Sequence, residues 1–336
     1  MNYNCILKTL AGESGYRLRQ AKKAVFVGLV NDWQEVSVLS VPLREALNRK
    51  CSLSIAGKIH SSKETASVKA IIELKDGLEI ESVLMRHNNN RNTVCVSSQA
   101  GCPLGCLFCA TGKMGFKRNL TSSEIIEQVV FFARLLKDEQ AKVTNVVFMG
   151  MGEPLLNYPE VIAAIDILND KDGFNLGIRH FSISTAGIIE GIDRMRDEKK
   201  DINLAISLHA ANDKLRKMLM PIANKYPLKK LLNSVDSYIK STKRKVMFEY
   251  LMIKGINDSL QDADELASIM SKPLYMVNLI CYNPTGNFMP SKPETITAFK
   301  QRLIDRGISV TQRYHFGGDI NAACGQLVYS KENNKA

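Results

Sequence analysis

Three cysteines in one short loop are the residues of this chain with the clearest chemistry. They follow the spacing C-x3-C-x2-C at Cys102, Cys106 and Cys109. Thiolates are the usual ligands of iron–sulfur clusters, and three of them leave one iron of a [4Fe–4S] cubane open to bind another molecule. Gly101 and Gly105 allow the loop to fold around a bulky inorganic core. The loop therefore predicts a chemically active cluster.

A zinc site and a disulfide framework are the alternatives for these thiols. Structural zinc sites use four ligands, usually as two separated pairs, so a zinc knuckle here would need a distant fourth ligand. Disulfide frameworks need an even number of cysteines and an oxidising compartment. Three thiols on one loop suit a cluster better than either alternative.

The composition is that of a globular protein with one large domain and a small appendage. The chain has 336 residues, of which 45% are hydrophobic, and a formal net charge of +11. This charge favours a polyanionic partner, most simply nucleic acid, although a single basic run is more often a solvated surface. The N-terminus lacks the apolar core of a signal peptide, and no apolar run is long enough to span a membrane. We expect a monomeric cytoplasmic protein whose cysteines are reduced, metal-bound or catalytic.

The elements that must position the loop follow a regular order. Residues 1–50 are predicted to be helical. Apolar and polar residues alternate on both sides of Asp76-Gly77, which predicts a β-hairpin over 70–84. After residue 92, strands alternate with amphipathic helices. Strands are predicted at 93–98, 145–149, 181–185, 203–208, 246–253, 276–282 and 309–312, and helices at 228–240, 262–270 and 296–306. Thr121 and Glu124 form a capping box that opens another helix.

This alternation predicts an α/β fold with a parallel sheet, specifically a partial (β/α)6 barrel. Sites in such barrels lie at the C-terminal ends of the strands, which is where the cysteine loop falls. We expect a small basic N-terminal domain over 1–88, the barrel over 89–312 and a C-terminal segment over 313–336.

Together with the aromatic residue before its last cysteine, the loop resembles that of the radical S-adenosylmethionine (radical SAM) superfamily. A glycine-rich turn, Met149-Gly-Met-Gly-Glu-Pro154, follows a predicted strand and is the second feature of this superfamily. In it, Gly152 would let the backbone approach the methionine part of the cofactor, and Glu153 would accept from its ammonium group. The resemblance implies a [4Fe–4S] cluster and S-adenosylmethionine as cofactors.

Further segments resemble the RlmN/Cfr family of RNA adenosine methyltransferases over essentially the whole chain. They are 94–102, 110–121, 183–187, 207–209, 282–284 and 319–327, of which Ala-Ala-Cys-Gly-Gln-Leu near the C-terminus is the most specific. The resemblance implies methylation of carbon 2 or carbon 8 of an adenine in 23S rRNA, with tRNA as a possible second substrate. Residues 115–119 resemble the carbon-2 enzymes, whereas 219–222, 282–285 and 316–319 resemble the carbon-8 branch.

The family's chemistry uses two molecules of S-adenosylmethionine per turnover and two protein thiols. One thiol accepts a methyl group by displacement, a radical made from the second cofactor molecule activates that methyl, and the other thiol resolves the protein–RNA adduct as a disulfide. By motif, Cys324 is the methyl-carrying thiol and Cys95 the resolving one. Glu81 matches the general base that takes the proton from the adenine carbon. On residue type alone, both cysteines could be small core residues and Glu81 an exposed strand glutamate.

The family's remaining cofactor contacts match five residues at predicted strand ends. They are Ser184, Ser207, Leu208, His209 and Asn283. An external electron donor such as flavodoxin or ferredoxin would reduce the cluster, and the basic N-terminal segment would contact RNA through its phosphates and shape. Cys5, Cys51 and Cys281 match no motif, and we expect them to be inert.

Two other classes of function stay open. A non-catalytic iron–sulfur RNA-binding protein would need neither Cys95 nor Cys324. A different radical enzyme, such as an activase, would need neither the C-terminal cysteine motif nor the excess of positive charge.

Overall fold

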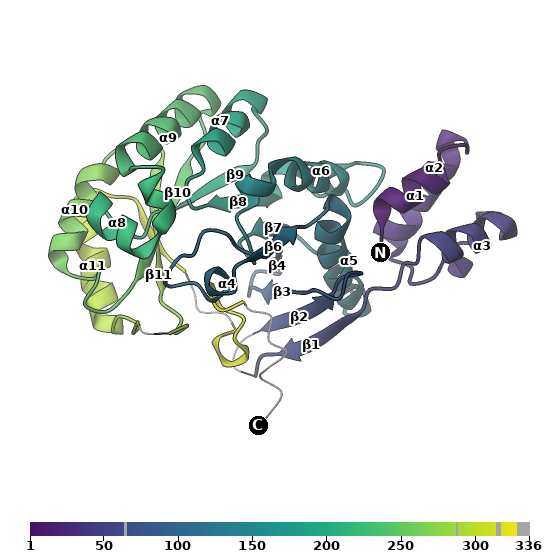
Figure 1. Ribbon diagram of the computed structural model, residues 1–336, viewed down its shortest axis with the longest axis horizontal. Helices are drawn as coiled ribbons and strands as arrows, with labels where there is room; N and C mark the ends of the chain where they lie inside the picture. The colour runs from purple at the N-terminus through teal and green to yellow at the C-terminus, as the bar shows by residue number, and fades with distance from the viewer. Residues whose placement is uncertain (64–65, 287, 314–316, 328–336) are drawn as a thin grey trace.

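The fold is built on a sheet of ten strands in the order β1-β2-β3-β4-β7-β8-β9-β10-β11-β12 (Figure 1). The computed structural model describes residues 1–63, 66–286, 288–313 and 317–327. The predicted C-terminal segment 313–336 therefore lies partly outside the described residues, as does Phe316 of the segment that resembles the carbon-8 branch.

Among the described residues, seven strands run parallel and follow one another in chain order. They are β4 (Asn92–Cys95), β7 (Asn145–Phe148), β8 (Phe181–Thr185), β9 (Asn203–Ser207), β10 (Val246–Met252), β11 (Tyr275–Cys281) and β12 (Val310–Gln312). The edge strands are β1 and β12, with no hydrogen-bonded ladder between them in the described part of the chain. Parallel neighbours joined by crossover helices form a barrel, and this one is open. The predicted partial barrel is confirmed.

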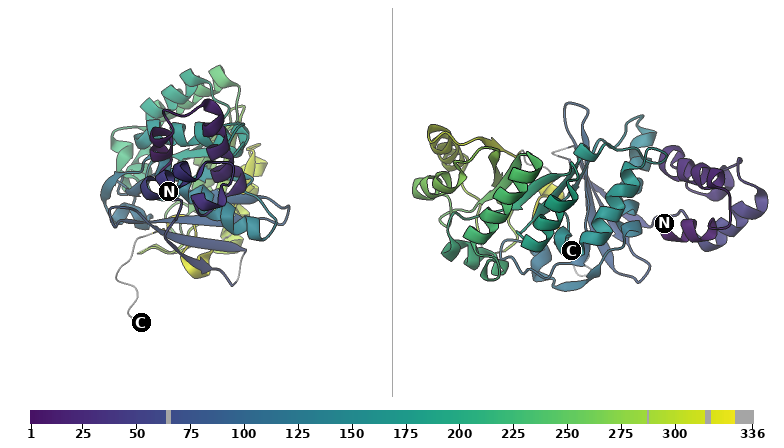
Figure 2. Two further views of the ribbon diagram at one scale, coloured as in Figure 1. Left: turned by 90° about the vertical axis from the view of Figure 1, so that its right-hand side faces the viewer. Right: turned by 90° about the horizontal axis from the view of Figure 1, so that it is seen from above.

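Helices cover the outer face of the parallel strands (Figures 1 and 2). They are α5 (Ser122–Asp138), α6 (Tyr158–Asn169), α7 (Ile189–Glu198), α9 (Leu228–Thr242), α10 (Leu260–Met270) and α11 (Pro293–Asp305). The short helix α8 (Asp213–Leu219) lies instead at the C-terminal ends of the strands, where the Arg216 side chain donates to the Ala186 carbonyl. The predicted capping box is present at the start of α5, where Thr121 and Glu124 cap each other's backbone N–H groups. In the described ranges, no helix has both the length and the apolar character needed to cross a membrane.

Successive side chains of the parallel strands point alternately toward the covering helices and toward the barrel lumen. In β7, Val146 and Phe148 are almost completely buried, whereas Asn145 and Val147 are half-buried and line a cavity. A strand points successive side chains to opposite faces, so every second residue faces the lumen. The lumen can therefore hold polar side chains without disturbing the apolar layer beneath the helices.

A hairpin extends the sheet on its other side. Strands β1 (Gly57–Ser61), β2 (Ser67–Glu73) and β3 (Glu79–Arg86) are antiparallel, and β3 pairs with β4. The hairpin predicted around Asp76-Gly77 is confirmed. It shares one sheet with the barrel strands, although it lies in the segment 1–88 that we assigned to a separate N-terminal domain.

The N-terminal helices lie at one end of the molecule, beside α5 and α6 (Figure 2). They are α1 (Tyr3–Thr9), α2 (Gly15–Lys23) with a π-helical turn at Ala24–Gly28, a 3-10 helix at Trp33–Glu35, and α3 (Val41–Lys50). The Arg134 guanidinium on α5 donates to the carbonyls of Leu53 and Val30 and ties the two parts together.

One expectation for this region is wrong. We expected reduced, inert thiols at Cys5 and Cys51, but these residues form a disulfide that joins α1 to the end of α3. Helix α1 contacts α3, and this packing brings together two cysteines that are 46 residues apart in sequence. Sequence spacing alone does not reveal such a contact.

Candidate active site

The cysteine loop is clamped at its base by a small two-stranded sheet. Strands β5 (Gln99–Gly101) and β6 (Phe116–Asn119) pair on either side of it, and the Cys102 N–H donates to the Gly115 carbonyl at 3.0 Å. Gly101 has a φ of 79°, and a Cβ there would overlap the Gly115 carbonyl oxygen. Only glycine therefore lets the two strands close beneath the loop.

Two further elements fix the upper part of the loop. The Leu107 N–H donates to the Leu219 carbonyl at the end of α8, and the Ala110 N–H donates to the Gly325 carbonyl in the C-terminal segment. The loop is thus attached on one side to α8 and on the other to the segment that carries Cys324.

The donor set of the loop fits an iron–sulfur cluster. Burial raises the pKa of Cys102 to about 12 and raises that of Cys106 still further, so without metal both groups are neutral thiols. A bound metal ion reverses this preference, because its charge deprotonates a coordinating thiol. Within the described ranges, no three His, Cys, Asp or Glu side chains are arranged to share one metal ion. A cubane does not require that arrangement, since each thiolate binds a different iron.

A cavity of about 160 Å³ lies directly beside these thiols. Its walls include five of the predicted cofactor residues at the ends of β7, β8 and β9: Gly152, Glu153, Ser184, Ser207 and His209. Gly152 has a φ of 99°, and a Cβ there would lie 2.5 Å from the Cβ of Gln99. The glycine-rich turn therefore lies close against β5, a contact that the sequence did not predict, and the approach of Gly152 to the cofactor stays a prediction.

Glu153 is a buried carboxylate held by backbone donors. Its two oxygens accept from the N–H groups of Leu155 at 3.0 Å and Ala186 at 2.8 Å. Burial raises the pKa of Glu153 to about 7, and these hydrogen bonds oppose the rise only in part. A cationic ligand in the cavity would stabilise the ionised form. The carboxylate therefore fits the ammonium group of S-adenosylmethionine.

His209 and Leu208 differ in their relation to the cavity. The ring of His209 lines it, accepts from the Leu251 N–H at Nδ1 and packs edge-on against Phe108 of the cysteine loop, with centroids 4.7 Å apart. Burial lowers the pKa of His209 to about 3, so the imidazole is neutral. Leu208 is fully buried and lines neither of the two cavities described here, so the structure does not bring it to the site.

Asn283 provides an independent sign of a missing ligand. Its Nδ2 donates to the Cys324 carbonyl at 3.1 Å, whereas its buried Oδ1 has no hydrogen-bond partner among the described residues. Buried polar atoms are nearly always paired, so this oxygen, in the wall of the large cavity described below, is open to a donor from a bound ligand. The amino group of the cofactor's adenine is such a donor.

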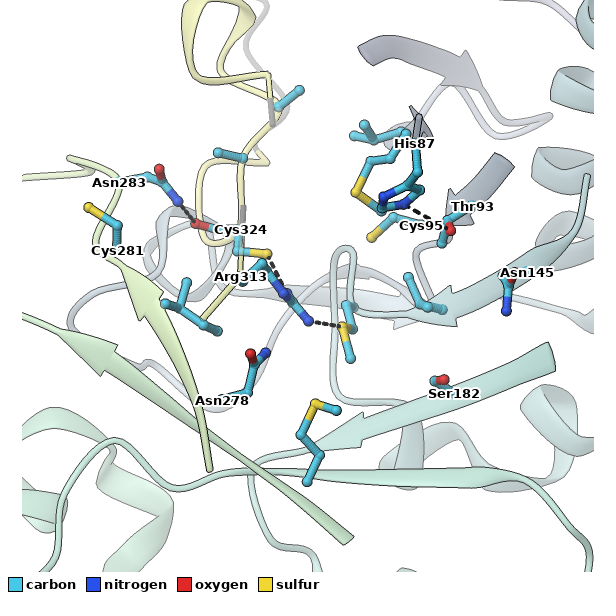
Figure 3. Close-up of a pocket in the computed structure, with 18 of the residues that line it drawn as sticks. His87, Thr93, Cys95, Asn145, Ser182, Asn278, Cys281, Asn283, Arg313 and Cys324 are labelled. Carbon is cyan, nitrogen blue, oxygen red and sulfur yellow. Dashed lines mark hydrogen bonds between the residues drawn. The ribbon is translucent and has the colours of Figure 1, made fainter. Parts of the chain in front are cut away.

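A second cavity, of about 480 Å³, occupies the barrel lumen (Figure 3). Cys95 on β4 and Cys324 in the C-terminal segment both line it, so the structure brings the two predicted thiols to one space. Cys324 also lines the smaller cavity and therefore lies where the two spaces meet. Burial, followed by the nearby Cys324, raises the pKa of Cys95 to about 12. Cys281 lines the large cavity as well.

Glu81 lies outside both cavities, at the start of β3. Its side chain is buried and its Oε1 lies 3.0 Å from Lys69 Nζ. Val83 and Met85, the next residues on the same face of β3, line the large cavity. The carboxylate therefore points toward the lumen from its rim, and its role as general base stays a prediction.

Sequence reasoning missed Arg313 and Glu249, which form an ion pair at 3.2 Å in the wall between the cavities. Both carried a signal in the sequence. Glu249 is a charged residue inside an otherwise apolar strand, and Arg313 directly follows the last predicted strand. A charged side chain at such a position in a barrel indicates a site.

The open barrel, the three-thiol loop and the adjoining glycine turn define a radical SAM enzyme. The sequence profile of the Radical SAM superfamily matches residues 96–267. A crystal structure of a radical SAM methyltransferase from Sphaerobacter thermophilus has a TM-score of 0.93 and 40% identity, over 97% of each chain.

Two curated relatives narrow the class. The probable dual-specificity RNA methyltransferase RlmN of Dictyoglomus turgidum is 43% identical over 318 residues, which cover 94% of this chain and 91% of that protein. The ribosomal RNA large subunit methyltransferase N of Nitrosopumilus maritimus is 41% identical over 326 residues, which cover 94% and 93%. The chain therefore belongs to the RlmN family of radical SAM RNA methyltransferases, which use a [4Fe–4S] cluster and S-adenosylmethionine.

Proposed function

We propose that this protein methylates a ring carbon, carbon 2 or carbon 8, of an adenine in 23S rRNA, with tRNA as a second substrate, through a methyl group carried on Cys324. The observation that carries the proposal is the position of Cys324 at the junction of the two cavities. From there its sulfur can take a methyl group on the side of the cofactor residues and present it to a base on the side of the lumen. The names of the relatives support RNA, and in one case large-subunit ribosomal RNA, as the substrate.

The large cavity suits a base that has left its stack. Its volume is within the range of small-ligand sites, and the polar residues Asn145, Ser182 and Asn278 line it. The first two lie at the N-terminal ends of their strands, opposite the cysteine loop. An enzyme that modifies a base carbon must extrude that base from its neighbours. The base would enter from the N-terminal ends of the strands and reach Cys324 from the side of the large cavity.

The remaining steps are assigned to particular residues of the chain. When bound, the cluster and S-adenosylmethionine supply the methyl group and the radical chemistry. Cys102, Cys106 and Cys109 hold the cluster, Cys95 resolves the adduct by forming a disulfide with Cys324, and Glu81 takes the proton from the adenine carbon. An external donor such as flavodoxin or ferredoxin supplies electrons, and the enzyme acts as a cytoplasmic monomer.

Single substitutions of the two thiols test this assignment. Cys95→Ala should trap a covalent protein–RNA species, because nothing can resolve the adduct, whereas Cys324→Ala should never form one. Cys281→Ala is the matched control, since Cys281 lines the same cavity without an assigned role. The readouts are denaturing gel electrophoresis of the RNA-bound protein and mass spectrometry of the RNA nucleosides, which also assigns the carbon.

Normal RNA methylation by both Cys95→Ala and Cys324→Ala would contradict the two-thiol mechanism. The non-catalytic alternative makes a different prediction. If the anaerobically reconstituted wild-type protein failed to cleave S-adenosylmethionine, the protein would be an RNA-binding member of the family rather than an enzyme.

A further inference from the structure

The guanidinium of Arg313 makes the one polar contact that the structure gives the Cys324 sulfur among the described residues. Its Nη1 donates to Cys324 Sγ at 3.1 Å, and its Nη2 lies 3.2 Å from Glu249 Oε1 and 3.4 Å from Met149 Sδ (Figure 3). Arg313 lines both cavities. It is therefore placed to act on Cys324 from the wall that separates them.

A row of side chains across three strands fixes this guanidinium. Glu249 is 3% exposed, and its second oxygen accepts from Asn278 Nδ2 at 2.7 Å. The Oδ1 of Asn278 in turn accepts from Thr311 Oγ1 at 2.9 Å. The register of β10, β11 and β12 places these three residues side by side. Because each member is held by the next, Arg313 approaches Cys324 from one direction.

The charge of Arg313 is preserved although it faces the protein interior. Burial by itself would lower the pKa of Arg313, but Glu249 and then Cys324 raise it above its usual value. The neighbouring thiol of Cys95 has a different environment, since burial raises its pKa to about 12 and Arg313 opposes this only in part. The structure thus distinguishes two thiols in one cavity, one in contact with a cation and the other buried as a neutral group.

We propose that Arg313 is a positioning residue that orients the Cys324 sulfur and stabilises the negative charge that this sulfur carries when it accepts the methyl group. This inference rests on the proposed function. The Cys324 thiol gives its proton to solvent, and the sulfur's electron pair then forms a bond to the methyl carbon of S-adenosylmethionine. The carbon–sulfonium bond breaks with its pair, so that a neutral thioether on Cys324 and neutral S-adenosylhomocysteine result. Only the thiolate is nucleophilic enough for this displacement.

The alkylation rate of Cys324 measures this role without RNA, cluster or turnover. Cluster-free protein is treated with iodoacetamide at one fixed pH, and labelling of the Cys324 peptide is followed by mass spectrometry. Arg313→Gln should slow the labelling by roughly tenfold or more, because a charge-assisted contact to the thiolate is lost. Arg313→Lys should recover most of the rate, since it restores the positive charge.

Arg244→Gln is the matched control. Arg244 also pairs with a carboxylate, that of Asp201, and donates to Asn203 at the N-terminal end of β9. Neither Arg244 nor Asn203 lines the two cavities that contain the thiols. Its loss should leave the labelling of Cys324 unchanged. Thermal denaturation of each variant shows whether it is folded.

Two results would overturn the proposal. One is labelling in Arg313→Gln that is as fast as in the wild type or faster, as expected if Arg313 only shields the sulfur. The other is an Arg313→Lys variant no faster than Arg313→Gln, as expected of a purely structural contact. Failure of the proposed function gives a different pattern. Wild-type Cys324 would then show the Arg313-dependent labelling but gain no methyl group when cluster-loaded protein is incubated with S-adenosylmethionine.

Discussion

At the scale of single residues, the site depends on buried polar groups that need a ligand to complete them. Asn283 Oδ1 has no partner in the described part of the chain, and Glu153 is a carboxylate whose charge is disfavoured by burial. Glu153 lines the small cavity beside the cysteine loop, whereas Asn283 lines the large one. Cofactor binding should therefore depend on the ionisation of Glu153.

The affinity for S-adenosylmethionine should weaken as the pH falls below about 7. The pKa of Glu153 is raised from 4.5 to about 7, so the carboxyl is mostly protonated in acid, and only the ionised form pairs with the cofactor's ammonium. We expect the dissociation constant to rise roughly tenfold per pH unit below this pKa and to level off above it. Equilibrium binding to anaerobic, cluster-loaded protein between about pH 8 and pH 6 measures this slope.

The Glu153→Gln variant keeps the shape of the residue but cannot ionise. It should bind the cofactor weakly at every pH and show a flat profile. If the variant kept the wild-type slope, a group other than Glu153 would be responsible.

At the scale of elements, local sequence signals set where helices and strands begin. The capping box at Thr121 sets the start of α5, and period-two alternation sets which strand residues face the lumen. The caps should contribute to folding without affecting chemistry, because α5 lies on the outer face of the barrel (Figure 1).

Thr121→Ala should lower the free energy of unfolding by about 1 kcal/mol, because the Glu124 N–H loses its side-chain acceptor. Urea denaturation followed by circular dichroism measures this change. Ser40→Ala is a suitable control, since Ser40 precedes α3 without a side-chain capping bond and its loss should cost little. Equal costs for the two variants, or a loss of cofactor binding in Thr121→Ala, would argue against a purely local role of the cap.

Strand and helix positions were predictable because their signals are local. The predicted strand at 181–185 coincides with β8, and the helix predicted at 228–240 is α9. The small sheet of β5 and β6 was not predicted, since its strands are short and flank an irregular loop. In the site, the three loop cysteines and the glycine-rich turn are contiguous motifs, so the sequence alone shows them. The roles of Arg313 and Glu249 depend on the ion pair between them, which only the tertiary structure shows.

At the scale of the whole molecule, contacts between distant segments join the N-terminal helices to the barrel and the C-terminal segment to the cluster loop. The Thr111 hydroxyl donates to the Leu327 carbonyl, and the Lys69 ammonium lies between the Glu81 carboxylate and the Asn321 carbonyl. The segment around Cys324 is therefore held from two sides, and the Cys5–Cys51 disulfide closes the N-terminal helices on themselves.

Removal of this disulfide should destabilise the N-terminal helices. A cross-link between residues 46 apart contributes about 4 kcal/mol when it acts by restricting the unfolded chain. The Cys5→Ser/Cys51→Ser double variant should unfold at a lower urea concentration than the wild type, by an amount that dithiothreitol reproduces on the wild type. Cys281→Ser should leave the midpoint unchanged. An equal midpoint for oxidised and reduced wild type would show that the bond does not stabilise the fold.

The sequence by itself determined the family and the barrel, and it contains the motifs that predict the cluster ligands and the two reacting thiols, because each depends on residues that are close together in the chain or on a motif that stands alone. The tertiary structure decided which of these groups meet. It placed Cys324 between two cavities, brought Cys95 into one of them, set Arg313 against Cys324 and paired Cys5 with Cys51. These contacts join segments that approach one another only when the strands pair in register and the helices pack, so no local pattern encodes them.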